Sequence, residues 1–64
     1  MNVRYYRDKK NLTQKQVGEM LGLSQKGFSK KERGDRKFTI DEALKLEEVL
    51  GVSIYELFED LKKL

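Results

Sequence analysis

Residues 12–34 read LTQKQVGEMLGLSQKGFSKKERG, and this stretch predicts two short helices joined by a tight turn. Thr13 followed by Gln16 fits a capping box, in which each side chain accepts a hydrogen bond from the other residue's backbone. The helix that follows should run over residues 14–21, and its apolar residues fall at i, i+3 and i+4: Val17, Met20 and Leu21. Gly18 in mid-helix costs about 1 kcal/mol relative to Ala, which predicts close packing against a neighbour.

The turn and the second helix have their own signals. Gly22 suits the positive φ that ends a helix, and Ser24 is a preferred N-cap for the next one. That helix should end near Arg33, with Gly34 as its stop. It carries one large apolar side chain, Phe28, so most of its surface is available for contact with something else.

A helical wheel separates an anchored edge of this second helix from a polar face. At 100° per residue, Ser24 and Glu32 fall within about 40° of Phe28. The opposite side carries cations and hydrogen-bonding groups: Lys26, Lys30 and Arg33, flanked by Ser29, with Gln25 projecting from the first turn. A helix about 10 to 12 Å across fits the major groove of B-DNA, where Lys pairs with guanine and Gln with adenine. An ordinary surface helix with scattered charge is the alternative.

Helices are also predicted on both sides of this pair. In residues 2–11, Val3 and Tyr6 share one side, and Asn11 is a suitable left-handed end residue. A helix capped by Thr39 and ended by Gly51 is expected to turn four apolar side chains inward: Ile40, Ala43, Leu44 and Leu50.

A last helix is predicted after Ser53, which has capping-box spacing to Glu56. Its apolar stripe follows i, i+3, i+4 and i+7: Ile54, Leu57, Phe58 and Leu61. The chain is therefore predicted to be all-α, with five helices.

An ion pair is predicted between the first helix and the third. Arg7 lies on the apolar side of the first helix, and Glu32 is the only acidic residue on the inward edge of the third. Losing one partner of such a pair, if it is buried, should cost about 3 to 5 kcal/mol.

Length and composition restrict the function. A chain of 64 residues makes one domain, residues 1–64, with a thin core. It has no Cys, His, Trp or Pro, which argues against disulfides, metal sites and His-based catalysis. We expect no catalytic residues, cofactor, metal or small-molecule substrate. No apolar segment is long enough to span a membrane or direct secretion, so we expect a cytoplasmic protein.

Charge is unevenly distributed along the chain. Residues 1–37 carry eleven Lys and Arg against four acids, a net charge of +7, and residues 38–64 carry three against seven, a net charge of −4. This asymmetry suggests one face suited to a polyanion, although solvated helix faces also produce charge runs.

Taken with LKLEEVLGVSIYELF at residues 44–58, the stretch at 12–34 resembles the helix-turn-helix domains of the lambda-repressor-like family, to which Cro and C1 repressors belong. The resemblance implies a compact five-helix domain whose motif spans about residues 14–33. The positions that carry it within the motif are Gln14, Val17, Gly18, Gly22, Leu23 and Phe28.

The resemblance also implies site residues and a partner, double-stranded DNA bound in the major groove of an operator. Base-edge contacts are implied for Gln25, Lys26 and Lys30. Phosphate contacts are implied for Gln14, Ser29, Arg33, Arg36 and Lys37. The Arg7–Glu32 pair is common in the family, in agreement with the wheel.

Two residues depart from the family pattern. Lys31 stands where a large apolar residue is usual, and we expect its methylenes to lie on the core while its ammonium reaches water. Gly27 replaces Thr, Tyr or Ser, and either loosens the helix or lets its backbone approach DNA closely.

We therefore expect a transcriptional regulator, Cro-like or C1-like, that binds a palindromic operator as a homodimer. Two recognition helices would then lie about 34 to 36 Å apart. Leftover apolar residues suggest the dimer interface, with completion of a small core as the alternative: Tyr55, Leu61 and Leu64.

A protein-interaction module, antirepressor or antitoxin-like, is the competing interpretation. The salt dependence of binding distinguishes a DNA-binding protein from a protein-interaction module. Affinity for DNA falls steeply as salt rises, whereas the affinity of a mostly apolar protein interface changes little.

Overall fold

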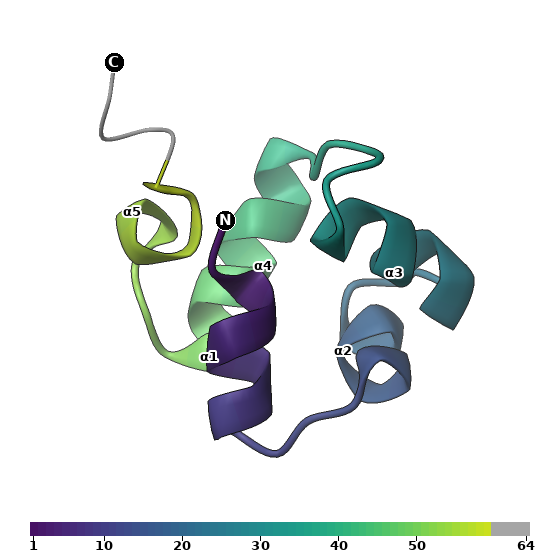
Figure 1. The fold of residues 1–64 in the computed structure, drawn as a ribbon, viewed down its shortest axis with the longest axis horizontal. Coiled ribbons are helices and arrows are strands. Elements are labelled where there is room, and N and C mark those ends of the chain that lie inside the picture. Colours follow the sequence, from purple (N-terminus) through teal and green to yellow (C-terminus); the bar gives the residue numbers. More distant parts are fainter. Residues whose placement is uncertain (60–64) are drawn as a thin grey trace.

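Five helices form in the computed structural model, which describes residues 1–59 (Figure 1). They are α1 (Val3–Lys9), α2 (Gln14–Met20), α3 (Gln25–Glu32), α4 (Ile40–Leu50) and α5 (Ile54–Leu57). Within this range there is no strand, and the all-α prediction is confirmed. None of the helices in residues 1–59 is both long enough and apolar enough to cross a membrane.

Side-chain caps start α2 and α4. Thr13 Oγ1 accepts from the Gln16 N–H at 3.0 Å, and Gln16 Oε1 accepts from the Thr13 N–H at 2.8 Å, which confirms the predicted capping box. Thr39 and Glu42 form the same arrangement at the start of α4, at 3.1 and 2.9 Å. Positive φ occurs at the four predicted helix ends: Asn11, Gly22, Gly34 and Gly51.

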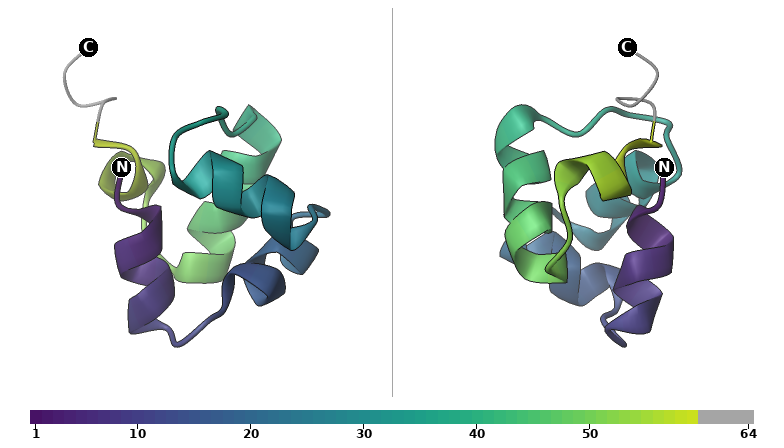
Figure 2. Two further views of the ribbon diagram at one scale, coloured as in Figure 1. Left: turned by 45° about the vertical axis from the view of Figure 1, so that its right-hand side comes forward. Right: turned by 90° about the vertical axis from the view of Figure 1, so that its left-hand side faces the viewer.

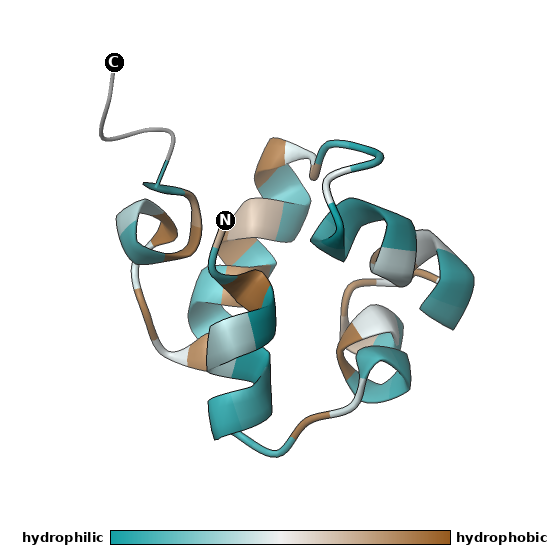
Figure 3. Cartoon of the chain, in the orientation of Figure 1, coloured by the Kyte–Doolittle hydropathy of each residue, from teal (hydrophilic) through white to brown (hydrophobic). Residues whose placement is uncertain are grey.

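One buried cluster joins the helices. Figure 3 shows the hydropathy of each residue along them. Its members are Val3, Val17, Phe28, Leu46, Leu50 and Leu57. Figures 1 and 2 show α2 and α3 on one side of the molecule and α5 on the other, with α1 and α4 between them. The start of α1 is tied to α5, because the Asn2 N–H donates to Leu57 O at 2.8 Å.

Close packing of α2 on α3 depends on Gly18. A Cβ added there would lie 3.2 Å from Leu23 O and 3.3 Å from Phe28 Cβ. The neighbours would have to shift to accept it, which confirms the packing explanation for a glycine in mid-helix.

The prediction for the inward face of α4 is wrong at two positions. Ile40 is 81% exposed and Leu44 is 50% exposed, whereas Leu46 is fully buried. Leu44 lies two residues before Leu46, which places it about 160° around the helix from the buried side. Leu50 is buried as predicted, and Ala43 is partly buried.

The last helix is shorter than predicted. Ser53 Oγ accepts from the Glu56 N–H at 3.3 Å, but α5 makes a single turn, and Phe58 leaves helical geometry with φ −121° and ψ 81°. The Phe58 ring instead packs edge-on against Phe38, with 5.7 Å between ring centroids. Leu61, the last residue of the predicted stripe, lies outside the described residues.

Candidate nucleic-acid interface

One aromatic side chain, Phe28, anchors helix α3 in the core. Phe28 is fully buried, and its ring lies 5.9 Å from that of Phe38, which follows the loop after α3. Ser24 caps the helix by accepting from the Gly27 N–H at 3.0 Å. A Cβ at Gly27 would lie 3.1 Å from this capping hydroxyl, so the glycine leaves room for the cap.

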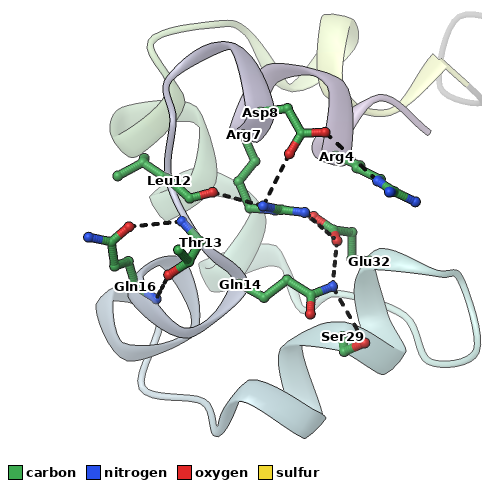
Figure 4. Close-up of polar contacts among 9 residues, drawn as sticks. All are labelled: Arg4, Arg7, Asp8, Leu12, Thr13, Gln14, Gln16, Ser29 and Glu32. Carbon is green, nitrogen blue, oxygen red and sulfur yellow. Dashed lines mark hydrogen bonds and ion pairs between the residues drawn. The ribbon is translucent and has the colours of Figure 1, made fainter.

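A buried ion pair ties α3 to α1 (Figure 4). Arg7 donates from Nε to Glu32 Oε2 at 2.7 Å and from Nη2 to Glu32 Oε1 at 3.1 Å. The side chains are 10% and 3% exposed, and Arg7 Nη1 also donates to Leu12 O at 2.8 Å. The hydrogen bond to Glu32 raises the pKa of Arg7 even though burial opposes this. The pair that the wheel indicated is present.

Gln14 extends this network to the start of α2. Its Nε2 donates to Glu32 Oε1 at 2.8 Å and lies 3.5 Å from Ser29 Oγ (Figure 4). Three helices therefore meet at the Glu32 carboxylate. The network fixes how α3 is presented relative to α1 and α2 and brings together Gln14 and Ser29, two of the predicted phosphate contacts.

The outward face of α3 borders a shallow polar hollow of about 430 Å³. Six of the eight predicted DNA contacts line it: Gln14, Gln25, Lys26, Ser29, Lys30 and Arg33. Neither Lys26 nor Lys30 forms an ion pair with another residue in the range 1–59. Arg33 pairs with Asp35 at 2.9 Å, but both side chains are about 60% exposed, so the pair contributes little to stability.

The other two predicted contacts, Arg36 and Lys37, lie in the loop between α3 and α4, outside this hollow. Both are exposed. The loop folds back on the end of α3, because the N–H groups of Asp35 and Arg36 donate to Lys30 O at 2.9 and 3.3 Å. These two hydrogen bonds hold the start of the loop against the last turn of α3.

The prediction for Lys31 is wrong about its ammonium group. Lys31 Nζ contacts Glu42 Oε1 at 2.6 Å, and the two side chains are only 14% and 13% exposed. The capping box at Thr39 holds Glu42 in position to receive it, since the same oxygen accepts from the Thr39 N–H. Burial alone would raise the pKa of Glu42, but the hydrogen bonds from Lys31 and Thr39 hold it below its usual value.

Sequence reasoning missed this second ion pair, although one signal for it was present. Glu42 stands three residues after Thr39, the capping-box spacing, which fixes a carboxylate near the start of α4. The pair links α3 to α4 as the Arg7–Glu32 pair links α3 to α1.

Of the residues predicted to form a dimer interface, the structure describes one. Tyr55 is exposed on α5. Leu61 and Leu64 lie outside the described residues.

Comparison with known proteins agrees with this geometry. The family model described as Helix-turn-helix matches residues 3–57, from the start of α1 to the end of α5. No curated protein and no solved structure matches the chain.

Proposed function

The chain belongs to the Cro/C1-type helix-turn-helix family of DNA-binding transcription regulators, and we propose that it is a repressor that occupies a palindromic operator as a homodimer. The fold of this family is that of DNA-binding regulators, and its members are not generally enzymes. One observation carries the proposal: α3 presents cations that pair with no described residue, on a helix whose inward edge is fixed by the Arg7–Glu32–Gln14 network.

Base reading is assigned to the first two turns of α3. Gln25 and Lys26 are exposed in the first turn, and Lys30 follows Lys26 by four residues on the same face. Gln presents both a donor and an acceptor to adenine, whereas the Lys ammonium donates to the N7 and O6 acceptors of guanine. These three side chains would therefore carry the sequence preference.

Phosphate binding is assigned to the residues around that face. Arg33 would exchange its exposed pair with Asp35 for a phosphate, which a guanidinium can also bind through two parallel hydrogen bonds. Ser29 and Gln14 also line the hollow, and Arg36 and Lys37 are exposed cations in the loop that follows α3. Contacts of this kind set register and affinity but not sequence.

A dimer follows from the small size of the reading surface. An eight-residue helix is about 12 Å long, so one copy reads only a few base pairs. Two copies related by a twofold axis would place their recognition helices in successive major grooves, about 34 to 36 Å apart.

Selection from random-sequence duplex DNA, combined with fluorescence anisotropy at several salt concentrations, tests the proposal. We expect an enriched palindrome and an affinity that falls steeply with salt. Folded protein that binds no duplex even at low salt would overturn the proposal and favour a protein-interaction module.

Two substitutions separate the contact classes. Lys37→Ala should weaken binding to all duplexes equally and lower the salt slope by about one unit, whereas Lys26→Ala should cost about 1 to 3 kcal/mol mainly on the selected operator. Lys45→Ala is the matched control, because it removes the same charge from α4 at a residue that does not line the hollow. Equal losses on specific and random DNA would show that Lys26 does not read bases.

A further inference from the structure

The loop between α3 and α4, residues 33–39, is tied to α3 at both of its ends (Figure 1). Backbone hydrogen bonds hold its start, where the N–H groups of Asp35 and Arg36 donate to Lys30 O at 2.9 and 3.3 Å. A side chain holds its far end, because Lys31 reaches the residues at the start of α4. Two consecutive residues of α3 therefore fix the two ends of one loop.

A single carboxylate oxygen makes the contact at the far end. Glu42 Oε1 accepts from the Thr39 N–H at 2.9 Å and from Lys31 Nζ at 2.6 Å. The Lys31 and Glu42 side chains are 14% and 13% exposed, so salt screens their pair less than it screens a pair on the open surface. Because Thr39 is the last residue of the loop, the pair fixes where the loop ends relative to α3.

Apolar packing also holds the loop, but it constrains direction less closely. The Phe38 ring lies 5.9 Å from the ring of Phe28 and 5.7 Å from that of Phe58. Apolar burial is largely non-directional, whereas a charge-assisted hydrogen bond is short and depends on the angle at which its groups meet. The rings keep the loop on the core, and the Lys31–Glu42 pair adds a fixed direction to that contact.

The loop carries two cations that form no ion pair within residues 1–59. They are Arg36 and Lys37, and both are exposed. Both side chains are long and lose rotamer entropy when they are held in one geometry, and no helix fixes the backbone beneath them. How well they reach two phosphates therefore depends on where the ends of the loop are held.

We propose that Lys31 and Glu42 are positioning residues for DNA binding, whose ion pair holds the loop where its two cations meet phosphates. The role rests on the DNA binding proposed above and adds two residues that do not themselves touch DNA. The Lys31 ammonium is paired with Glu42 and mostly buried, so it is not one of the cations that face the duplex.

A double variant of unchanged net charge tests this role. Lys31→Met with Glu42→Gln removes one cation and one anion. Glutamine can keep the capping box at the start of α4, as Gln16 does at the start of α2. Methionine is flexible enough to fill the space of the lysine stem, and no buried charge is left without its partner. The variant should therefore fold, which circular dichroism checks.

The assay is fluorescence anisotropy of the full chain on random-sequence duplex DNA across a salt series. We expect the double variant to lower the salt slope by about 0.9 for each loop cation that loses its phosphate, which weakens binding about eightfold per cation at about 0.1 M salt. Lys37→Ala gives the specific readout. It should lower the slope of the wild type by about one unit and barely change that of the double variant. Equal effects in both backgrounds would overturn the role, because a purely structural pair would not alter what Lys37 contributes.

Glu42→Gln alone gives a test by sign. If overall charge alone mattered, removing an acid would strengthen binding to a polyanion. A positioning role predicts weaker binding instead. Asp41→Asn is the matched control, because Asp41 is the exposed neighbour of Glu42 on α4 and forms no ion pair within residues 1–59. The control should bind at least as tightly as the wild type, and tighter binding by Glu42→Gln would contradict the role.

The outcomes separate this role from the proposed function. Wild-type protein that binds no duplex would overturn the proposed function, and the role of the pair with it. Wild-type binding with a steep salt dependence, matched by the double variant at every salt concentration, would overturn the role of the pair alone. A slope lowered by Lys31→Met but unchanged by Glu42→Gln would show that Lys31 itself contacts a phosphate, which also overturns the positioning role.

Discussion

Replacing Arg7 with alanine should remove most of the stability of this domain. Arg7 makes two hydrogen bonds to Glu32 and one to Leu12 O, all between 2.7 and 3.1 Å. Without it, the Glu32 side chain, which is 3% exposed in the intact domain, keeps only the neutral donor Gln14. Breaking a buried pair in this way costs about 3 to 5 kcal/mol. A 64-residue domain has about 3 to 10 kcal/mol in total, at 0.05 to 0.15 kcal/mol per residue.

Urea denaturation followed by circular dichroism measures this loss. In a thermal scan the melting temperature should fall by at least about 12 °C, since 1 kcal/mol shifts it by about 4 to 8 °C in a domain of this size. Arg4→Ala is the matched control. Arg4 is on the same helix, but its side chain is 79% exposed and its contact with Asp8 is 3.8 Å, so the change should stay within about 0.5 kcal/mol.

A double substitution separates loss of the pair from loss of packing. Arg7→Met with Glu32→Met removes both charges and retains most of the volume, and it should recover much of the stability that Arg7→Ala loses. Stability of Arg7→Ala within 1 kcal/mol of Arg4→Ala would refute the reasoning, because the buried carboxylate would then have found another partner or reached water.

The remaining predictions concern three other contacts. Phe28→Ala should cost about 3 to 5 kcal/mol in urea denaturation, and a loss below 1 kcal/mol would show that Phe28 does not anchor α3. Gly18→Ala should lower the urea midpoint, because overpacking costs about 1 to 3 kcal/mol while helix propensity returns about 1 kcal/mol; a higher midpoint would contradict this. The folded-state pKa of Glu42 is lowered, so its contribution is present above its unfolded pKa and is lost as pH falls through the folded value. The stability difference between wild type and Glu42→Gln should therefore shrink as pH falls below about 4.3, and a constant difference would rule out the coupling.

Local chemistry made much of the fold predictable. The caps at Thr13, Ser24 and Thr39 follow from hydrogen bonds between residues three positions apart, which a sequence displays directly. The Arg7–Glu32 pair was also predictable, because Arg7 is a cation on the apolar side of the first helix and Glu32 is the one acidic residue on the inward edge of the third.

The errors came where tertiary packing decided the outcome. Which side of α4 is buried depends on where α2 and α5 lie, and the sequence offered apolar residues on more than one side of that helix. Phe58 leaves helical geometry, and its ring meets that of Phe38, twenty positions earlier, a contact that the periodicity of one helix does not predict. Lys31 found a carboxylate on another helix, a contact that a wheel drawn for α3 alone cannot contain.

The sparse anchoring of α3 separates what the protein recognises from what makes it fold. Its hold on the rest of the molecule comes through Phe28, Lys31 and Glu32, none of which is among the three predicted base contacts. Exposed positions such as Gln25 and Lys26 can change identity at a cost within about 0.5 kcal/mol. Related chains could thus change the DNA sequence that they bind without changing their buried residues. A designer could likewise substitute these exposed side chains of α3 and leave the rest of the domain unaltered.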